Sequence, residues 1–279
     1  MRWKNLEGIL LNRFLRDYKL IITTTSQTIE VTAPLNIDFD CEKSILSDGL
    51  NTLNIKIYNL TEAKRNQLVK DKDEKKYIRV QLFIGYEGNI KQVFQGNVNR
   101  AYTERAGADL ATMMECIDGL ADVKSSFSSK TASTKKQAVQ EILKDMPNTS
   151  IGKITESNKI YRNKVIMGSS YEELKKLVQP DEIMFIDEEK LYIIKDTEVS
   201  DNYAPVISSD TGLIGIPKKE DKIVEVTTIL NPAIKLGGLA QLESIYAPYL
   251  NGTYRVESSS FKGSFDGSDW TQNVRLKQR

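Results

Sequence analysis

The stretch YIRVQLFIGYEGNIKQVFQGNV, residues 77–98, decides the fold class of this chain. Residues 77–84 are rich in β-branched and aromatic side chains, and residues 90–98 follow a similar pattern. Between them, Gly85 to Asn89 are residue types that favour turns. Two such runs around a glycine-containing turn predict an antiparallel hairpin.

The same pattern recurs on both sides of this hairpin. In residues 52–60, Leu53, Ile55 and Ile57 alternate with polar positions, which is the period of two of a half-buried strand. Further strands are predicted at residues 9–24, 27–31, 35–40 and 109–117. Residues 1–120 should therefore form an antiparallel sheet of about six or seven strands, the size of a small barrel or sandwich.

A short helix is expected between two of these strands. Thr61 can cap it, and Glu62 lies in its first turn. The charges of residues 70–76 alternate in sign, so this run predicts a solvated loop after the helix.

Residues 121–200 have a different character. Residues 125–134 are rich in Ser, Thr and Lys and predict a linker. Residues 134–146 carry apolar side chains at helical spacing, and a second helix should start at Ser170, where Ser-Tyr-Glu-Glu matches a capping box. Residues 183–194 predict a hairpin that turns at its two glutamates. This middle part is expected to be a small α+β domain.

The charge of this domain is uneven. Residues 124–164 carry nine basic and three acidic side chains, a net charge of +6, whereas residues 171–201 carry four basic and ten acidic ones, a net charge of −6. The two halves either neutralise each other within the domain or leave a basic patch for an acidic partner.

Strands return in residues 201–279, with a turn at residues 263–269. The predicted strands are residues 206–207, 214–217, 222–230, 254–261 and 270–276. The plan is thus β (1–120), α+β (121–200) and β (201–279), an α+β fold that is mainly β.

Composition excludes several functions. The chain of 279 residues has 39 basic and 38 acidic side chains, and this balance argues against a generic nucleic-acid coat. It has no histidine, which excludes Ser-His-Asp and Cys-His catalysis and zinc sites that contain histidine. Cys41 and Cys116 are expected to be small buried hydrophobes, although a disulfide between them stays possible. So few cysteines suit a chain made in a reducing cytoplasm.

The N-terminus lacks the apolar core of a signal peptide, and no window approaches the roughly 18 apolar residues of a membrane span. No phosphate-binding glycine motif is present.

The segment from Asp266 to Asp269 faintly resembles a calcium loop but lacks the spacing of one, and a hairpin turn is the simpler interpretation. We expect no metal and no cofactor. If the protein were an enzyme, paired carboxylates of the glycosidase type would be the sharpest option.

Several strings in a fixed order resemble bacteriophage tail baseplate hub proteins. They are residues 54–61, 82–86, 93–98 and 115–120 for a first barrel, 170–178 and 183–193 for an inserted domain, and 231–238, 252–256 and 260–270 for a second barrel. The resemblance implies two barrels like those of tail-tube proteins, flanking the inserted domain. The same fold occurs in type VI secretion spikes and other contractile injection systems.

The resemblance also implies a function. A hub of this family is a non-enzymatic homotrimeric ring in the virion that joins the sixfold tail tube to the threefold central spike and lets DNA pass. Its implied partners are a tail tube or tube-initiator protein, the spike and a tape-measure protein, with no sequence-specific nucleic-acid binding and no membrane insertion. Two alternatives stay open: a tail-associated carboxylate glycosidase and a glycan- or receptor-binding β module.

Interface residues follow by analogy. The candidates are Thr61, Glu62, Arg65, Lys70, Lys72 and Lys75 around the short helix, with Asp266 and Asp269 in the last turn. The sequence ends soon after the last predicted strand, so a lysozyme or spike activity is expected on another chain. We expect the protein to be made in the cytoplasm of the host bacterium.

Overall fold

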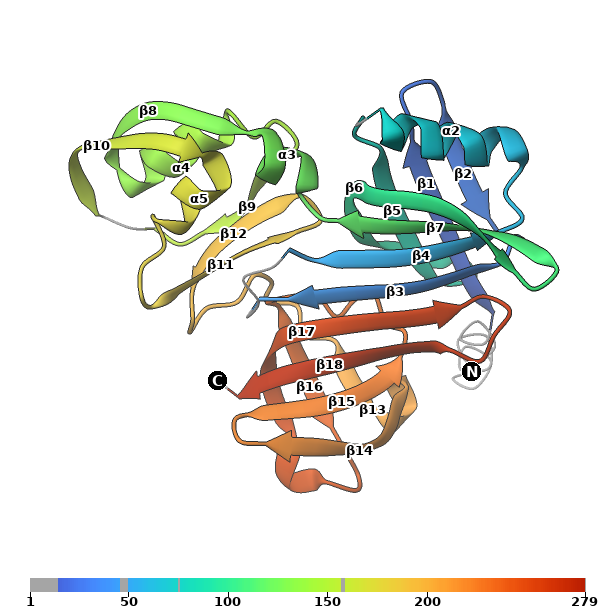
Figure 1. Cartoon of the computed structure of the whole chain (residues 1–279). Coiled ribbons are helices and arrows are strands. Elements are labelled where there is room, and N and C mark those ends of the chain that lie inside the picture. Colours follow the sequence, from blue (N-terminus) through green and yellow to red (C-terminus); the bar gives the residue numbers. More distant parts are fainter. Residues whose placement is uncertain (1–14, 46–49, 75, 157–158, 279) are drawn as a thin grey trace.

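A computed structural model describes residues 15–45, 50–74, 76–156 and 159–278 (Figure 1). The fold is α+β and mainly β, as the sequence predicts. The first part contains β1 (Arg16–Thr23), β2 (Thr28–Thr32), β3 (Ile37–Ser44), β4 (Thr52–Tyr58), α2 (Glu62–Asp73), β5 (Arg79–Tyr86), β6 (Asn89–Ala106) and β7 (Asp109–Ile117). Of the strand predicted over residues 9–24, residues 9–14 lie outside the described residues.

The middle part contains short helices and two small sheets. Its elements are α3 (Leu120–Ser125), β8 (Phe127–Thr134), α4 (Lys135–Leu143), β9 (Ser150–Ile154), β10 (Ile160–Ser169), α5 (Ser170–Lys175), β11 (Glu182–Asp187) and β12 (Lys190–Lys195). The last part contains β13 (Val206–Ser208), η1 (Ser209–Thr211), β14 (Leu213–Glu220), β15 (Ile223–Ile229), β16 (Leu239–Glu243), η2 (Pro248–Leu250), β17 (Gly252–Ser264) and β18 (Trp270–Gln278).

The two tail-tube-like barrels that the resemblance implies are neither closed nor separate among the described residues. Thirteen strands form one continuous sheet with the order β14-β15-β18-β17-β3-β4-β7-β6-β5-β1-β2, and β16 and β13 branch from β17. Strand β17 causes this, because its first residues pair with β16 while residues 258–264 pair with β3. An irregularity between Val256 and Ser258 separates the two parts of the strand. Both β units therefore share one hydrogen-bonded sheet.

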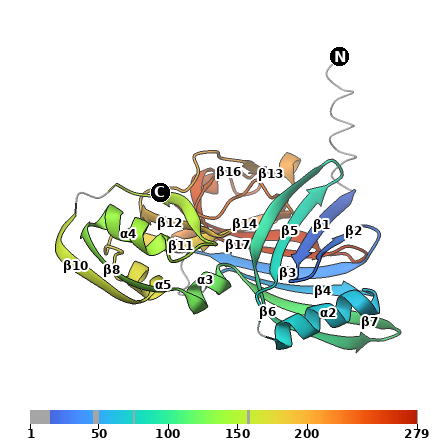
Figure 2. The same ribbon diagram turned by 90° about the horizontal axis from the view of Figure 1, so that it is seen from above.

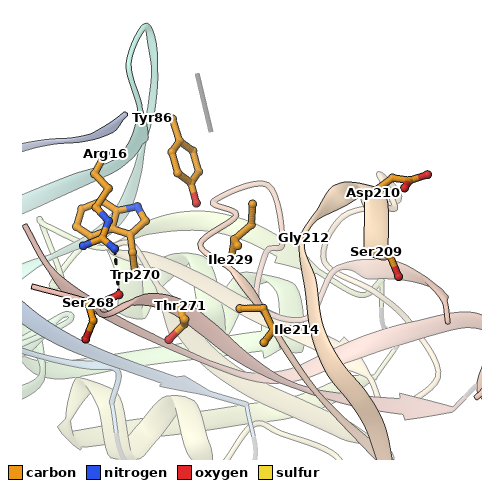
Figure 3. Close-up of a pocket in the computed structure, with 10 residues that line it drawn as sticks. All are labelled: Arg16, Tyr86, Ser209, Asp210, Gly212, Ile214, Ile229, Ser268, Trp270 and Thr271. Carbon is orange, nitrogen blue, oxygen red and sulfur yellow. Dashed lines mark hydrogen bonds between the residues drawn. The ribbon is translucent and has the colours of Figure 1, made fainter. Parts of the chain in front are cut away.

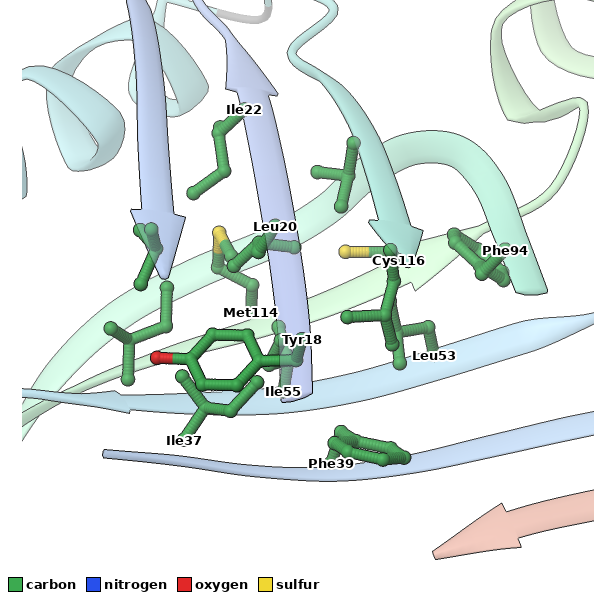
Figure 4. Close-up of a cluster of buried hydrophobic side chains, with 14 of the residues drawn as sticks. Tyr18, Leu20, Ile22, Ile37, Phe39, Leu53, Ile55, Phe94, Met114 and Cys116 are labelled. Carbon is green, nitrogen blue, oxygen red and sulfur yellow. The ribbon is translucent and has the colours of Figure 1, made fainter. Parts of the chain in front are cut away.

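The largest core lies between the strands of the first part (Figure 4). The alternating residues Leu53, Ile55 and Ile57 are all buried in it, as predicted. Leu230, Phe261 and Trp270 of the last part belong to the same cluster. A second cluster fills the middle part and a third fills the last part. The boundaries at residues 120 and 200 stay predictions.

The two cysteines are buried and free. In the sheet register Leu53 of β4 lies opposite Cys41 of β3 on one side and opposite Cys116 of β7 on the other. Two strand spacings of about 4.8 Å separate them, which is too far for the Cα atoms of a disulfide.

The middle part corrects two predictions. Residues 127–134 are not a linker but strand β8, which pairs with β10, a strand that the sequence did not reveal. The expected capping box at Ser170 is also wrong, because Ser169 occupies the N-cap position without a side-chain cap. The Ser170 hydroxyl instead lies 2.9 Å from the Ser128 hydroxyl, which ties α5 to β8.

The middle part lies at one end of the molecule, and β1, β2 and α2 lie at the other (Figure 2). Its two charge halves meet in a buried ion pair between Lys135 and Glu182. No helix of the described residues is both long enough and apolar enough to cross a bilayer.

Candidate assembly surfaces and a buried junction

Helix α2 carries most of the predicted interface residues. Thr61, Glu62 and Lys70 are exposed, and Arg65 and Lys72 are half-buried. Lys75 lies outside the described residues. Burial and then Lys124 lower the pKa of Lys72. The prediction of a loop at residues 70–76 is wrong for its first half, because the helix continues to Asp73.

The helix is polar on almost every side, and two buried residues hold it. Leu68 and Asp71 are its buried residues. The Asp71 carboxylate accepts hydrogen bonds from the Thr25 amide at 3.1 Å, the Thr25 hydroxyl at 2.9 Å and the Gln67 amide at 2.7 Å. Burial raises the pKa of Asp71, but the hydrogen bonds outweigh it and hold the pKa below its ordinary value. This carboxylate anchors α2 to the connection between β1 and β2 and so extends the helix beyond the predicted end.

Replacing Asp71 with Asn should therefore weaken the attachment of α2 and lower the stability of the fold. The amide nitrogen of Asn cannot accept the bonds that the second carboxylate oxygen accepts, so we expect a loss of about 1–3 kcal/mol in the free energy of unfolding. Urea denaturation measures it. Asp73→Asn on the exposed side of the same helix is the matched control and should change stability by less than about 0.5 kcal/mol. Equal effects of the two variants would contradict the anchoring role.

Asp266 and Asp269 lie exposed in the turn between β17 and β18, as predicted. Arg16 holds this turn, because its guanidinium donates to the carbonyl oxygens of Ser264 at 2.9 Å, Gly267 at 2.5 Å and Ser268 at 3.0 Å. This turn is part of the C-terminal hairpin, whereas α2 packs on β6. The predicted interface residues therefore form two separate groups, one around α2 and one in the β17–β18 turn. Among the described residues, no group of three or more acidic or cysteine side chains is arranged to hold a metal ion.

A buried polar junction lies where the β11–β12 hairpin meets the large sheet, and the sequence did not reveal it. The Lys43 ammonium on β3 lies 2.7 Å from the Asp187 carboxylate and 3.4 Å from that of Glu188. The Asn51 side chain donates to Ile186 and to Asp187. Burial lowers the pKa of Lys43, but the two carboxylates outweigh it and hold the pKa above its ordinary value.

The hairpin turn itself is fixed by Asp118. Its two oxygens accept the backbone amides of Glu188 at 2.7 Å and Glu189 at 2.9 Å, and both glutamates have positive φ. Burial, and next the charge of Asp187, raise the pKa of Asp118 to about 8, although the two amides and Lys43 act against this.

Three parts of the chain meet at this turn. Lys235 of the last part lies 3.0 Å from Glu188, and Arg79 of β5 pairs with Glu189. The junction therefore fixes the middle part against both β units. One feature of the sequence could have indicated this junction: two adjacent glutamates occupy a tight hairpin turn, where Asn-Gly is favoured.

A pocket of about 540 Å³ lies between the two β units (Figure 3). Arg16 and Tyr86 come from the first unit, and Ile214, Ile229 and Trp270 come from the second. The Arg16 guanidinium lies 5.6 Å from the Trp270 ring centre. Trp270 is 4% exposed, and its indole N–H has no hydrogen-bond partner among the described residues. We call this space the Trp270 pocket.

Comparisons with known proteins agree with this architecture. A 43 kDa tail protein of prophage MuSo2 from Shewanella oneidensis aligns with a TM-score of 0.64 and 9% identity over 94% of this chain and 98% of its own. A tail protein from Neisseria meningitidis gives 0.60 and 8%, over 94% and 96% of the two chains. An Escherichia coli component of the type VI secretion system gives 0.63 and 8%, over 92% and 76%. At these identities the similarity shows the fold alone.

The sequence comparison is more specific. No curated protein sequence matches this chain significantly. The family profile of the baseplate hub gp41 matches residues 18–267, which is most of the chain. That range contains the large sheet up to the last turn, the inserted part and the junction between them. The chain therefore belongs to the baseplate hub gp41 family of phage tail proteins.

Proposed function

We propose that this protein is the structural, non-enzymatic hub of a tail baseplate, a homotrimeric ring that joins a sixfold tail tube to a threefold spike and leaves a passage for DNA. Its partners are the tube or a tube-initiator protein on one face and the spike on the other, with the tape-measure protein as a further candidate. It is made in the bacterial cytoplasm and acts in the virion.

One observation carries this proposal: strand β17 pairs with β3 and so joins both β units into one sheet. A copy in which the units are joined in this way presents two β units at a fixed separation. Three copies then present six units around one axis, which is what a change from threefold to sixfold symmetry requires. The buried junction keeps the middle part fixed on the same body.

The mass in solution tests the proposal. Light scattering behind size exclusion should give about 95 kDa, three times 31.6 kDa, for the chain alone. For a ring that closes only on its partner, addition of the spike protein should give a complex whose mass equals three copies of this chain plus the bound spike. A monomer that persists with the spike would overturn the ring. Turnover of peptidoglycan that a single Asp or Glu substitution abolishes would favour the glycosidase instead, and glycan binding by the isolated monomer would favour the receptor-binding module.

A further inference from the structure

The middle part touches the two β units at few places. Among the described residues, only α3 packs on an element of these units, namely β6, and no other helix or strand of the middle part packs along them. The middle part also has a core of its own, and Leu50 is the one apolar side chain of the described β units that packs against it. An interface of separate contacts without a large apolar area allows one part of a chain to move against another.

A small apolar cluster completes this interface. It contains Ile45 of the first part, Phe185 and Ile194 of the middle part, and Leu236 of the last part, all buried. The core of the middle part has twelve buried members, so it buries far more apolar surface than these four. Since hydrophobic stabilisation scales with the apolar area buried, separating the interface costs less than unfolding the middle part.

Two connections of the chain lead into and out of the middle part. One runs through Asp118 and Gly119 into α3, and the other is residues 196–205, which form no helix or strand between β12 and β13. Asp196, at the start of the second connection, lies 2.7 Å from Arg255 and 2.9 Å from Lys277, which keeps the connection on the last part. Connections without regular structure absorb the changes in backbone angles that a hinge requires.

The turn of the β11–β12 hairpin is strained and depends on the junction. Both of its residues, Glu188 and Glu189, have positive φ, at 54° and 57°, a conformation that glutamate rarely adopts. Their backbone amides both donate to Asp118, which lies outside the middle part. A strained turn persists only where surrounding contacts hold it, so opening of the junction releases this strain.

The charges of the closed junction are unequal. Its carboxylates outnumber its cations by one, because Asp118, Asp187, Glu188 and Glu189 lie together with Lys43, Arg79 and Lys235. The Cys41 thiol faces the same cluster and stays neutral, since burial raises its pKa to about 12. Asp122 of α3 acts on Glu189 but accepts hydrogen bonds of its own from Asn148 and Thr149.

A proton on Asp118 removes this surplus of negative charge. Asp118 is 1% exposed, so its ionised carboxylate would lie where little water can solvate it. Burial, and next the charge of Asp187, raise its pKa to about 8. An open junction returns the carboxyl group to water, where its pKa is about 3.9. Between these two values the closed junction binds a proton that the open junction releases.

We propose that the middle part is a hinged unit and that the junction is its latch, which closes with the uptake of one proton. The open state keeps the core and the sheets of the middle part and separates the β11–β12 turn from Lys43 and Asp118. Acid favours closure, and the opening constant rises by at most about tenfold per pH unit between pH 5 and 8. The latch acts within one chain, so it does not depend on the ring.

Hydrogen exchange of single amides in the full chain tests the latch. The Glu188 and Glu189 amides lose their acceptor when the junction opens, whereas Leu191 and Ile193 of β12 pair within the middle part. After correction for intrinsic rates, the two turn amides should exchange at least about tenfold faster than those of β12 at pH 6. Equal rates would mean that only global unfolding exposes the turn, and would overturn the latch.

Two variants test the proton. Asp118→Asn has no carboxyl group to titrate, so the opening constant of its turn should stay constant between pH 5 and 8. Asp145→Asn is the matched control, because Asp145 pairs with Lys130 inside the middle part and keeps this partner when the latch opens. Its turn should show the pH dependence of the wild type. If Asp118→Asn showed that dependence as well, the proton uptake would be wrong.

Distances between spin labels test the hinge itself. Labels at Ile160→Cys in the middle part and Tyr249→Cys in the last part occupy positions that are 78% and 79% exposed, and the native cysteines are buried. An excess of unlabelled chain restricts the measurement to distances within one copy. We expect one narrow distance in the otherwise native chain and after Lys175→Met, and a second, broader distribution after Lys43→Met.

The outcome of the label experiment decides between a hinge and a rigid body. A folded Lys43→Met chain that keeps the narrow distance alone would overturn the hinge, and a second distribution in a folded chain supports it. If Lys43→Met prevents folding, the exchange rates of the wild-type turn decide by themselves, because they need no variant.

Discussion

Replacing Lys43 with Met is expected to lower the free energy of unfolding by about 3–5 kcal/mol. Lys43 is 5% exposed, and its ammonium contacts the carboxylates of Asp187 and Glu188 where the inserted hairpin meets β3. Methionine fills a similar volume but leaves the Asp187 carboxylate without its cation in a site with little water, whereas Glu188 keeps Lys235. Removal of one partner of a buried pair costs more than the pair contributes, because the remaining charge loses its compensation.

Urea denaturation of the full chain measures this effect. Lys175→Met is the control, since Lys175 is 37% exposed beside an exposed Glu172 and its loss should cost less than about 1 kcal/mol. If Lys43→Met also lowered the free energy of unfolding by less than about 1 kcal/mol, water would reach the junction. The junction would then not hold the parts of the chain together.

The free energy of unfolding is expected to fall as the pH rises from 5 to 8. The pKa of Asp118 is about 8 in the folded chain and about 3.9 in an unfolded one, so between these values the folded state holds a proton that unfolding releases. Its contribution is fully present below the unfolded pKa and is lost as the pH rises through the folded pKa. One such group gives a slope of at most about 1.4 kcal/mol per pH unit.

Between pH 5 and 8 the change in stability can be assigned to few groups. No histidine titrates there, because the chain contains none. Burial raises the pKa of Glu189, which adds to the slope in the same direction. Asp118→Asn should flatten the curve between pH 5 and 8, as measured by urea denaturation at each pH.

Asp145 supplies the matched control. Burial raises its pKa, but hydrogen bonds from Lys130 and Ser128 outweigh this and hold the pKa below the ordinary value. Its contribution is therefore present at pH 5 and above and is lost only on further acidification. Asp145→Asn should change the level of stability but keep the slope between pH 5 and 8. If the Asp118→Asn variant kept the slope of the free energy of unfolding between pH 5 and 8, other groups would be responsible for that slope.

Sequence reasoning succeeded where the pattern is local. The period of two in residues 52–60 predicted β4 and its buried face, and the helical spacing of Val139 and Ile142 predicted α4. It failed where the partner is distant. Residues 127–134 carry few apolar side chains, and only pairing with β10 makes them a strand. Asp71 seemed to belong to a solvated charge run, yet Thr25, far away in the chain, makes it an anchor.

The candidate sites divide in the same way. The sequence placed Glu62 and Arg65 in the first turns of a helix and Asp266 and Asp269 in a turn between strands, because helix starts and turns depend on neighbouring residues. Thr61 occupies the N-cap position, as predicted, but its side chain makes no capping hydrogen bond. The sequence by itself determined the mainly β composition of the fold, its local strands and helices, and the exclusion of histidine chemistry. Tertiary structure alone decided that β3 and β17 join two units into one sheet, that Lys43 and Asp118 are buried together, and that Trp270 lines a pocket. Strand partners and the exclusion of water depend on segments far apart in the chain, which no local pattern records.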